Sequence, residues 1–181
     1  MVDQKSQLLM RFARIIAADG YDRDLQPVQW QALSFLRSAN RFSRTPKALT
    51  AWLGQTKGSV SQTVIALEKK GLVAKRADPG DLRLVRLELT QAGVNLLGNP
   101  PAGLAEQMLA HLTADQRDQV VALIEAMLMA ELAQNGGHPF GVCRDCRHFE
   151  QAATSKNRCA LLDVALSVQD SGHICVEQEA A

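Results

Sequence analysis

The chain has 181 residues, a length that suits one domain with an appendage. Apolar residues make up 46% and charged residues 22% of it, which is ordinary for a globular protein and excludes wholesale disorder. Its apolar runs are too short to cross a membrane, and the first twelve residues lack the pattern of a signal peptide. We therefore expect a cytoplasmic protein with no membrane partner.

Charge is unevenly distributed along the sequence. The net charge is only +1, but residues 41–90 hold ten bases and four acids. A basic segment in an otherwise acidic chain is typical of a surface that binds nucleic acid. Lysine and arginine that only coat exposed helices would give the same count, so the motifs within the segment have to distinguish a nucleic-acid surface from ordinary solvated helices.

The first half of the chain predicts four helices. Apolar residues at helical spacing predict one over residues 7–18, and Pro27 can begin a second that runs to about residue 38. Two more, over residues 46–53 and 57–70, each follow a threonine suited to an N-cap and end at a glycine. The short turn between the last two predicts a helix-turn-helix, whose second helix enters a DNA major groove.

The outer face of the helix over residues 57–70 carries candidate DNA contacts. Val60, Val64 and Leu67 form its inward stripe. The rest of the surface consists of short polar or basic side chains that are predicted to reach base edges: Lys57, Ser59, Ser61, Gln62 and Thr63. A solvated helix could also carry these residues, but few such helices would lack an acid until Glu68.

Two strands are expected next, over residues 72–76 and 83–89, around a turn at residues 78–81. A basic hairpin beside a recognition helix predicts the wing of a winged-helix domain. An arginine near its tip suits a narrow minor groove, where the negative potential is strongest. The candidate DNA-binding residues of the wing are Arg76, Arg83 and Arg86.

Four motifs of the hairpin resemble the MarR family of bacterial transcriptional regulators. They are Gly71-Leu72-Val73, the basic Arg76, the Asp81-x-Arg83 pair and Leu89-Thr90-x-x-Gly93. The resemblance covers roughly residues 5–134 and implies a homodimer that binds a double-stranded DNA operator, with small molecules as frequent effectors. It also implies that Arg83 reaches DNA and that Asp81 stabilises the wing. Leu82 departs from the family, which often has another arginine there.

A helix pair over residues 102–134 is expected to form a dimer interface. Its charge is negative and unsuited to DNA, and Thr113 to Gln116 form a capping box that restarts the helix. A wide apolar stripe runs along it: Leu104, Met108, Leu112, Val120, Leu123, Ile124, Met127, Leu128 and Leu132. A partner subunit would cover this stripe and that of residues 7–18. Packing within one subunit is the alternative.

All four cysteines lie in the last 39 residues: Cys143, Cys146, Cys159 and Cys175. In a cytosolic protein they indicate a metal site more than structural disulfides. A tail this small cannot bury a large core, so it needs a bound metal to hold its fold. Four thiolates suit either structural zinc or a [4Fe–4S] cluster. We favour the cluster, because the second cysteine pair is widely split and the pattern resembles small cluster-binding subunits of some glycyl-radical enzymes. A thiol–disulfide switch stays open.

The sequence therefore predicts a mainly α fold with a small β-hairpin wing. Its expected parts are an N-terminal dimerisation helix (1–24), a winged helix-turn-helix (25–98), further dimerisation helices (99–135) and a four-cysteine tail (136–181). The predicted function is a dimeric DNA-binding regulator, most simply a repressor, whose tail senses redox or metal state. Two alternatives are a regulator with a small-molecule effector and an inert zinc tail, and an iron–sulfur electron carrier or docking module. No catalytic constellation is present, so we expect no enzyme.

Overall fold

The structure is a computed structural model that describes residues 3–18, 24–78, 80–98, 103–134, 137, 140–151 and 157–179. The elements up to the end of the long helix are α1 (Gln4–Ala17), α2 (Pro27–Ser38), α3 (Pro46–Leu53), α4 (Lys57–Lys69), β1 (Val73–Ala77), β2 (Val85–Leu89), α5 (Gln91–Leu97), α6 (Leu104–Ala110) and α7 (Ala114–Gln134). This order is that of a mainly helical winged helix-turn-helix with a hairpin wing, so the predicted fold class is confirmed.

The helix-turn-helix begins and ends where its caps predict. The hydroxyl of Thr45 accepts a hydrogen bond from the backbone N–H of Ala48 at 3.1 Å, and Thr56 does the same for Ser59 at 3.2 Å. Gly54 ends α3 at a φ of 59°, a conformation that glycine adopts at little cost. The turn between α3 and α4 is therefore determined by local sequence.

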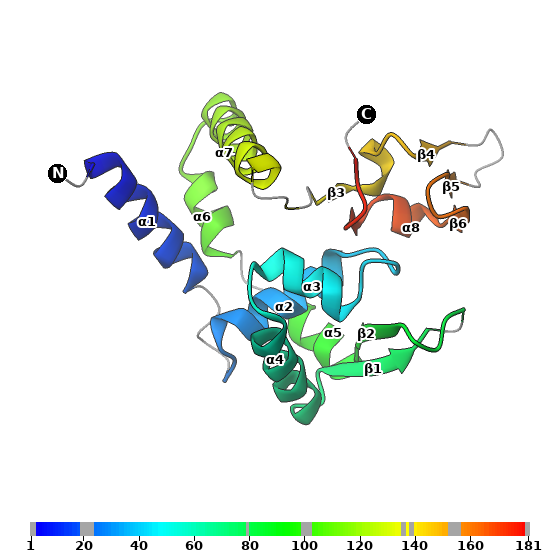
Figure 1. Cartoon of the computed structure of the whole chain (residues 1–181). Helices are drawn as coiled ribbons and strands as arrows, with labels where there is room; N and C mark the ends of the chain where they lie inside the picture. The colour runs from blue at the N-terminus through cyan, green and yellow to red at the C-terminus, as the bar shows by residue number, and fades with distance from the viewer. Residues whose placement is uncertain are drawn as a thin grey trace.

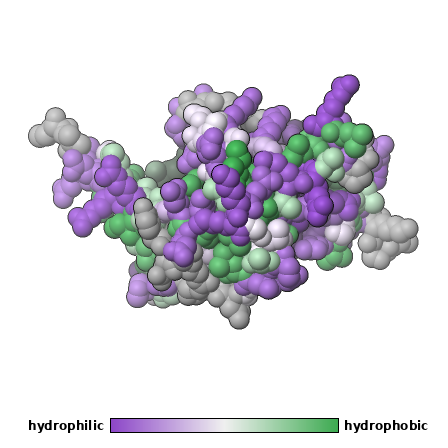
Figure 2. Space-filling model, turned by 90° about the horizontal axis from the view of Figure 1, so that it is seen from below, coloured by the Kyte–Doolittle hydropathy of each residue, from purple (hydrophilic) through white to green (hydrophobic). Residues whose placement is uncertain are grey.

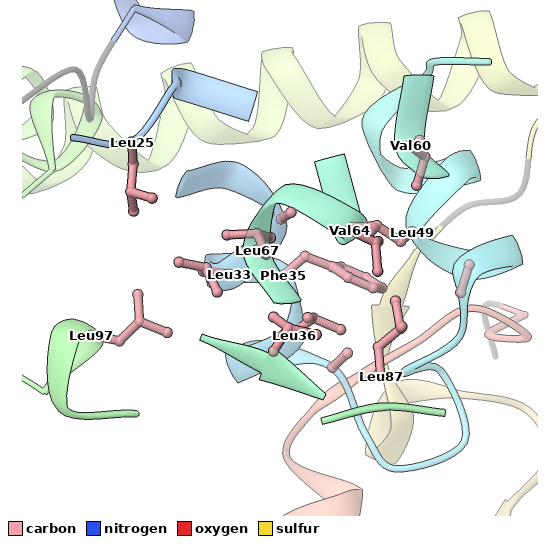
Figure 3. Close-up of a cluster of buried hydrophobic side chains, with 14 residues drawn as sticks. Leu25, Leu33, Phe35, Leu36, Leu49, Val60, Val64, Leu67, Leu87 and Leu97 are labelled. Carbon is pink, nitrogen blue, oxygen red and sulfur yellow. The ribbon is translucent and has the colours of Figure 1, made fainter. Parts of the chain in front are cut away.

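The core of the winged helix is built around Phe35, which is 1% exposed (Figure 3). Leucines from α2, α3, α4 and β2 surround it, and all of them are fully buried: Leu33, Leu36, Leu49, Leu67 and Leu87. Val60 and Val64 of the predicted inward stripe of α4 are 1% and 2% exposed, so that prediction is confirmed. This core holds α4 and the wing in a fixed relation to each other.

The wing is an antiparallel pair in which Val73 lies opposite Leu89 and Ala77 lies opposite Val85. The second strand starts two residues later than expected, because the tip is a longer turn. There the carboxylate of Asp81 accepts the N–H of Arg83 at 2.9 Å, and its carbonyl accepts the N–H of Leu84 at 2.9 Å. Pro79, part of the expected turn, lies outside the described residues.

Helix α5 was not predicted, although its cap lies in one of the motifs quoted above. The Thr90 hydroxyl accepts the N–H of Gly93 at 3.1 Å and donates to the carbonyl of Gly71 at 2.6 Å. A Cβ on Gly93 would lie 2.3 Å from the carbonyl oxygen of Leu72. This close backbone approach explains why glycine follows the threonine at that spacing.

Helices α1, α6 and α7 contain no buried residue. In Figure 1 they stand apart from the winged helix, and the apolar residues of α1 and α7 include Leu8 at 69% exposed and Leu123 at 65%. The predicted capping box before α7 is present, because Thr113 and Gln116 each bond the other's backbone N–H. Within the described residues, none of these helices has the length and apolar character needed to span a membrane.

The tail folds back beside α3 and the wing (Figure 1). Its elements are β3 (Gly141–Val142), a single 3₁₀ turn (Cys143–Asp145), β4 (Phe149–Glu150), β5 (Asn157–Cys159), β6 (Val164–Leu166), α8 (Val168–Ser171) and β7 (Ile174–Cys175). They form two small sheets, β3 with β7 and β4-β5-β6. The chain enters the tail through Phe140, whose ring lies edge-on to Phe35 at 6.1 Å and to Trp52 at 5.1 Å.

Candidate DNA-binding surface and cysteine cluster

Helix α4 presents four of its five predicted DNA contacts to solvent. Lys57, Ser59, Ser61 and Gln62 are exposed. Thr63 differs from this prediction: it is 8% exposed and its hydroxyl donates to the carbonyl of Ser59 at 3.1 Å. It lies on the inward side of the helix, because it is adjacent to Val64 and three residues after Val60. Figure 2 shows the molecule from below, where hydrophilic side chains are interspersed with hydrophobic patches.

The three wing arginines have different surroundings. Arg83 is exposed near the tip, and Arg76 has a 69% exposed side chain that lies 3.6 Å from the carboxylate of Glu88. Both side chains can reach a ligand outside the protein. A surface ion pair of this kind costs little to exchange for a phosphate contact.

Arg86 faces inward, contrary to its predicted place on the DNA-binding surface. Its side chain is 17% exposed and lies 2.6 Å from the carboxylate of Asp78. It also donates to the carbonyl oxygens of Arg41 at 3.1 Å and Phe42 at 2.5 Å. Arg86 therefore fastens the wing to the loop between α2 and α3, which uses the donors that DNA would need.

Asp78, expected only as a turn residue, is the ion-pair partner of Arg86. Its hydrogen bond from Arg86 holds the pKa of the carboxyl below its ordinary value, and backbone bonds from Gly80 and Asp81 act in the same direction. Asp81, predicted to stabilise the wing, bonds within the turn itself. The available signal was an acid in the expected turn and an arginine on the strand that follows it.

The four cysteines gather at the centre of the tail. Cys143, Cys159 and Cys175 are buried, at 4%, 8% and 6% exposed, and Cys146 is half-buried. The three buried cysteines pack with Leu166, and around them lie three partly buried apolar side chains: Phe42, Phe149 and Val164. Phe42 belongs to the loop between α2 and α3, so the winged helix also contributes to the surroundings of the cysteines.

Burial and the neighbouring sulfurs disfavour free thiolates in this cluster. Burial is the larger cause, and together with the nearby Cys175, Cys159 and Cys146 it raises the pKa of the Cys143 thiol to about 12. Four thiolates cannot share so small a volume unless a positive ion lies among them. The donor set thus fits a four-thiolate centre in number, type and burial.

Backbone donors also point at the sulfurs. The N–H of Glu179 donates to the sulfur of Cys146 at 3.4 Å. Burial raises the pKa of Cys175, and hydrogen bonding from Asn40, the Glu177 backbone and Ser43 acts in the opposite direction. Donors of this kind stabilise metal-bound thiolates. Among the described residues, no group of three or more Cys, His, Asp or Glu side chains has an arrangement that could hold a metal ion. Binding would require the sulfurs to turn toward a common centre.

The elements and their order define a winged helix-turn-helix fold with a β-hairpin wing. Residues 23–84 match the model of the MarR family, the same family that the hairpin motifs resemble. The chain is 26% identical over 137 residues to the transcriptional repressor MprA of Escherichia coli K12. That match covers 73% of this chain and 76% of the relative.

Solved structures agree with this fold. A probable transcriptional regulator from Pseudomonas aeruginosa is 28% identical, with a TM-score of 0.55 over 69% of this chain and 97% of that one. S. aureus MepR in its DNA-binding conformation is 22% identical, with a TM-score of 0.62 over 71% of this chain and 98% of that one. At that identity the likeness to MepR concerns the fold alone.

Proposed function

We propose that this chain is a homodimeric, sequence-specific DNA-binding transcriptional repressor. The observation that carries the proposal is the exposed face of α4, which holds Lys57, Ser61 and Gln62 beside a wing that presents Arg76 and Arg83. Short polar side chains suit base edges, and arginines suit phosphates and the minor groove. The relative MprA is named a transcriptional repressor, and MepR has been solved as a DNA complex.

The dimer follows from the apolar residues of α1 and α7. Ile124, Met127 and Leu128 of α7 are about half exposed, as is Leu9 of α1. Apolar surface of this extent on helices with no buried residue is expected to be covered by a partner. A second copy of the chain is the simplest partner, and it would place two winged helices on successive half-sites of one operator.

Replacing Lys57 and Arg83 together with alanine is expected to weaken operator binding by two orders of magnitude or more, at about 1–3 kcal/mol for each lost contact. The dependence of affinity on salt should also become less steep. Fluorescence anisotropy with a duplex selected from random sequence by the wild-type protein measures both.

The matched control replaces Arg144 and Arg158 with alanine. Both are exposed on the tail, and their loss removes the same charge from a place outside the DNA-binding surface and the proposed dimer interface. This variant should bind the operator as wild type does. Unchanged affinity of the Lys57 and Arg83 double variant would show that another surface binds DNA.

We further propose that the tail holds a metal centre through Cys143, Cys146, Cys159 and Cys175, with a [4Fe–4S] cluster favoured over zinc. When bound, the metal supplies a cation that binds all four thiolates and ties the two small sheets of the tail together. The chain's own residues bury the site and supply N–H donors to the sulfurs. The same centre would make the regulator responsive to redox or metal state.

Protein purified without oxygen tests the tail by its visible spectrum and its iron, sulfide and zinc content. A broad visible absorption with about four irons per chain indicates the cluster, and a colourless chain with one zinc indicates a structural site. Cys143→Ser should abolish either metal, whereas Arg158→Ala, which changes an exposed neighbour of Cys159, should retain it. Full metal content in Cys143→Ser would exclude the proposed ligand set.

A further inference from the structure

We propose that the loop joining α2 to α3, residues 39–45 (the α2–α3 loop), senses whether Cys175 holds the metal and transmits this to the wing. The inference rests on the four-thiolate centre proposed above. It assigns a new role to Asn40 and Ser43 of this loop, which is to position the sulfur of Cys175 that binds the metal.

The tail docks on this loop along the segment that contains Cys175. The N–H of Asn40 donates to the carbonyl of Ile174 at 2.8 Å, and the N–H of Val176 donates to the hydroxyl oxygen of Ser43 at 2.9 Å. Ala39 and Ile174 form a parallel β-bridge. The residues on either side of Cys175 are therefore held by the loop.

Two buried side chains of the loop, those of Asn40 and Ser43, lie near Cys175. Asn40 is 1% exposed; its amide oxygen accepts the N–H of Ser43 at 2.9 Å, and its amide nitrogen has no hydrogen-bond partner. Ser43 is fully buried, and because its oxygen accepts from Val176, its proton is available to the sulfur. A buried donor without an acceptor is costly. A metal-bound thiolate drawn toward these groups would satisfy it.

The opposite side of the loop holds the wing and the start of α3. Arg86 of the wing donates to the carbonyls of Arg41 and Phe42, and the N–H of Leu87 donates to the carbonyl of Arg44 at 2.7 Å. The last residue of the loop, Thr45, caps α3. A displacement of the loop would therefore move the wing and the helix-turn-helix together.

The structure leaves room for such a displacement. A cavity of about 510 Å³ lies between the loop, α3, the wing and the tail, and Phe42, Lys47, Leu84, Leu162 and Glu177 are among its lining residues. Protein interiors are otherwise close-packed.

The proposed sequence of events starts at the metal. Binding draws the sulfur of Cys175 into a fixed position, where Asn40 and Ser43 donate to it and the α2–α3 loop is held in place. When the metal is lost, the sulfur is free to rotate, the two donors lose their acceptor, and the loop and the wing bonded to it are held less firmly. The metal-loaded protein is thus the form that binds DNA tightly.

The test compares protein purified without oxygen with the same protein stripped by a chelator, using the selected operator duplex. In wild type we expect the loaded form to bind roughly tenfold more tightly than the stripped form. In Ser43→Ala the two forms should bind within about twofold of each other, although metal content stays at the wild-type level. Ser38→Ala, at an exposed serine that ends α2, should keep the wild-type ratio.

A second measurement reports on the sulfur itself. Cd²⁺ bound to the stripped protein gives an ultraviolet thiolate-to-metal charge-transfer band, which should move to longer wavelength in Ser43→Ala because the sulfur has lost a hydrogen bond. Asn40→Ala should show the same shift and the same loss of coupling, so it replaces Ser43→Ala if that variant does not fold.

Different failures have different meanings. A wild-type protein with full metal content and equal affinity in both forms overturns the coupling and leaves the metal centre intact. A wild-type ratio in both Ser43→Ala and Asn40→Ala excludes this loop as the path. A chain that binds no metal in any preparation overturns the proposed centre, and the inference with it.

Discussion

Replacing Phe35 with alanine is expected to lower the free energy of unfolding of the winged helix by about 3–5 kcal/mol. Phe35 is 1% exposed and lies among the leucines of four elements, so its removal leaves a cavity that a rigid core fills poorly (Figure 3). The centroid of its ring also lies 5.2 Å from that of the Trp52 ring and 6.1 Å from that of the Phe140 ring. Urea unfolding followed by far-ultraviolet circular dichroism measures the loss.

Phe140→Ala is the matched control for this prediction. It removes the same side chain from the same aromatic cluster, but from the tail side and from a half-buried position. We expect it to loosen the tail and to leave the unfolding of the winged helix within about 1 kcal/mol of wild type. Equal effects of the two changes would mean that tail and winged helix unfold as one unit.

Replacing Gly93 with alanine is expected to destabilise the winged helix by about 3 kcal/mol, at the upper end of what overpacking costs. The new Cβ would lie 2.3 Å from the carbonyl oxygen of Leu72, and backbone cannot move aside as a flexible side chain can. Either α5 or the start of β1 has to shift. The thermal unfolding midpoint should fall accordingly.

Gly58→Ala provides the comparison, because it makes the same chemical change in open space. A Cβ there meets only the Thr56 hydroxyl oxygen at 3.9 Å, and alanine favours a helix. We expect stability equal to wild type or up to about 1 kcal/mol higher. A Gly93→Ala protein as stable as Gly58→Ala would contradict the close approach of α5 to Leu72.

The parts of the fold that sequence predicted are those determined by neighbouring residues. Thr45 and Thr56 cap their helices because a hydroxyl needs only the N–H three residues later. Val60, Val64 and Leu67 are buried because helical spacing puts them on one side. The same spacing argument applied to Thr63 would have placed it beside them.

The parts that sequence missed depend on residues far apart in the chain. The inward turn of Arg86 requires carbonyls of residues 41 and 42, which are more than 40 positions away. The donors proposed for Cys175 are Asn40 and Ser43, which lie more than 130 positions earlier in the chain. The spacing of the cysteines indicates that a cluster can form, but it contains no information about which loop completes its surroundings.

The long chain separation between Ser43 and Val176 has a consequence for how each molecule is made. Synthesis proceeds at about 5–20 residues per second, and domains usually fold as they emerge. The winged helix is complete at α5, and the partner of Ser43 follows some 80 residues later, a delay of several seconds. Every newly made molecule therefore passes through a period in which its DNA-binding part has folded and its tail does not yet exist.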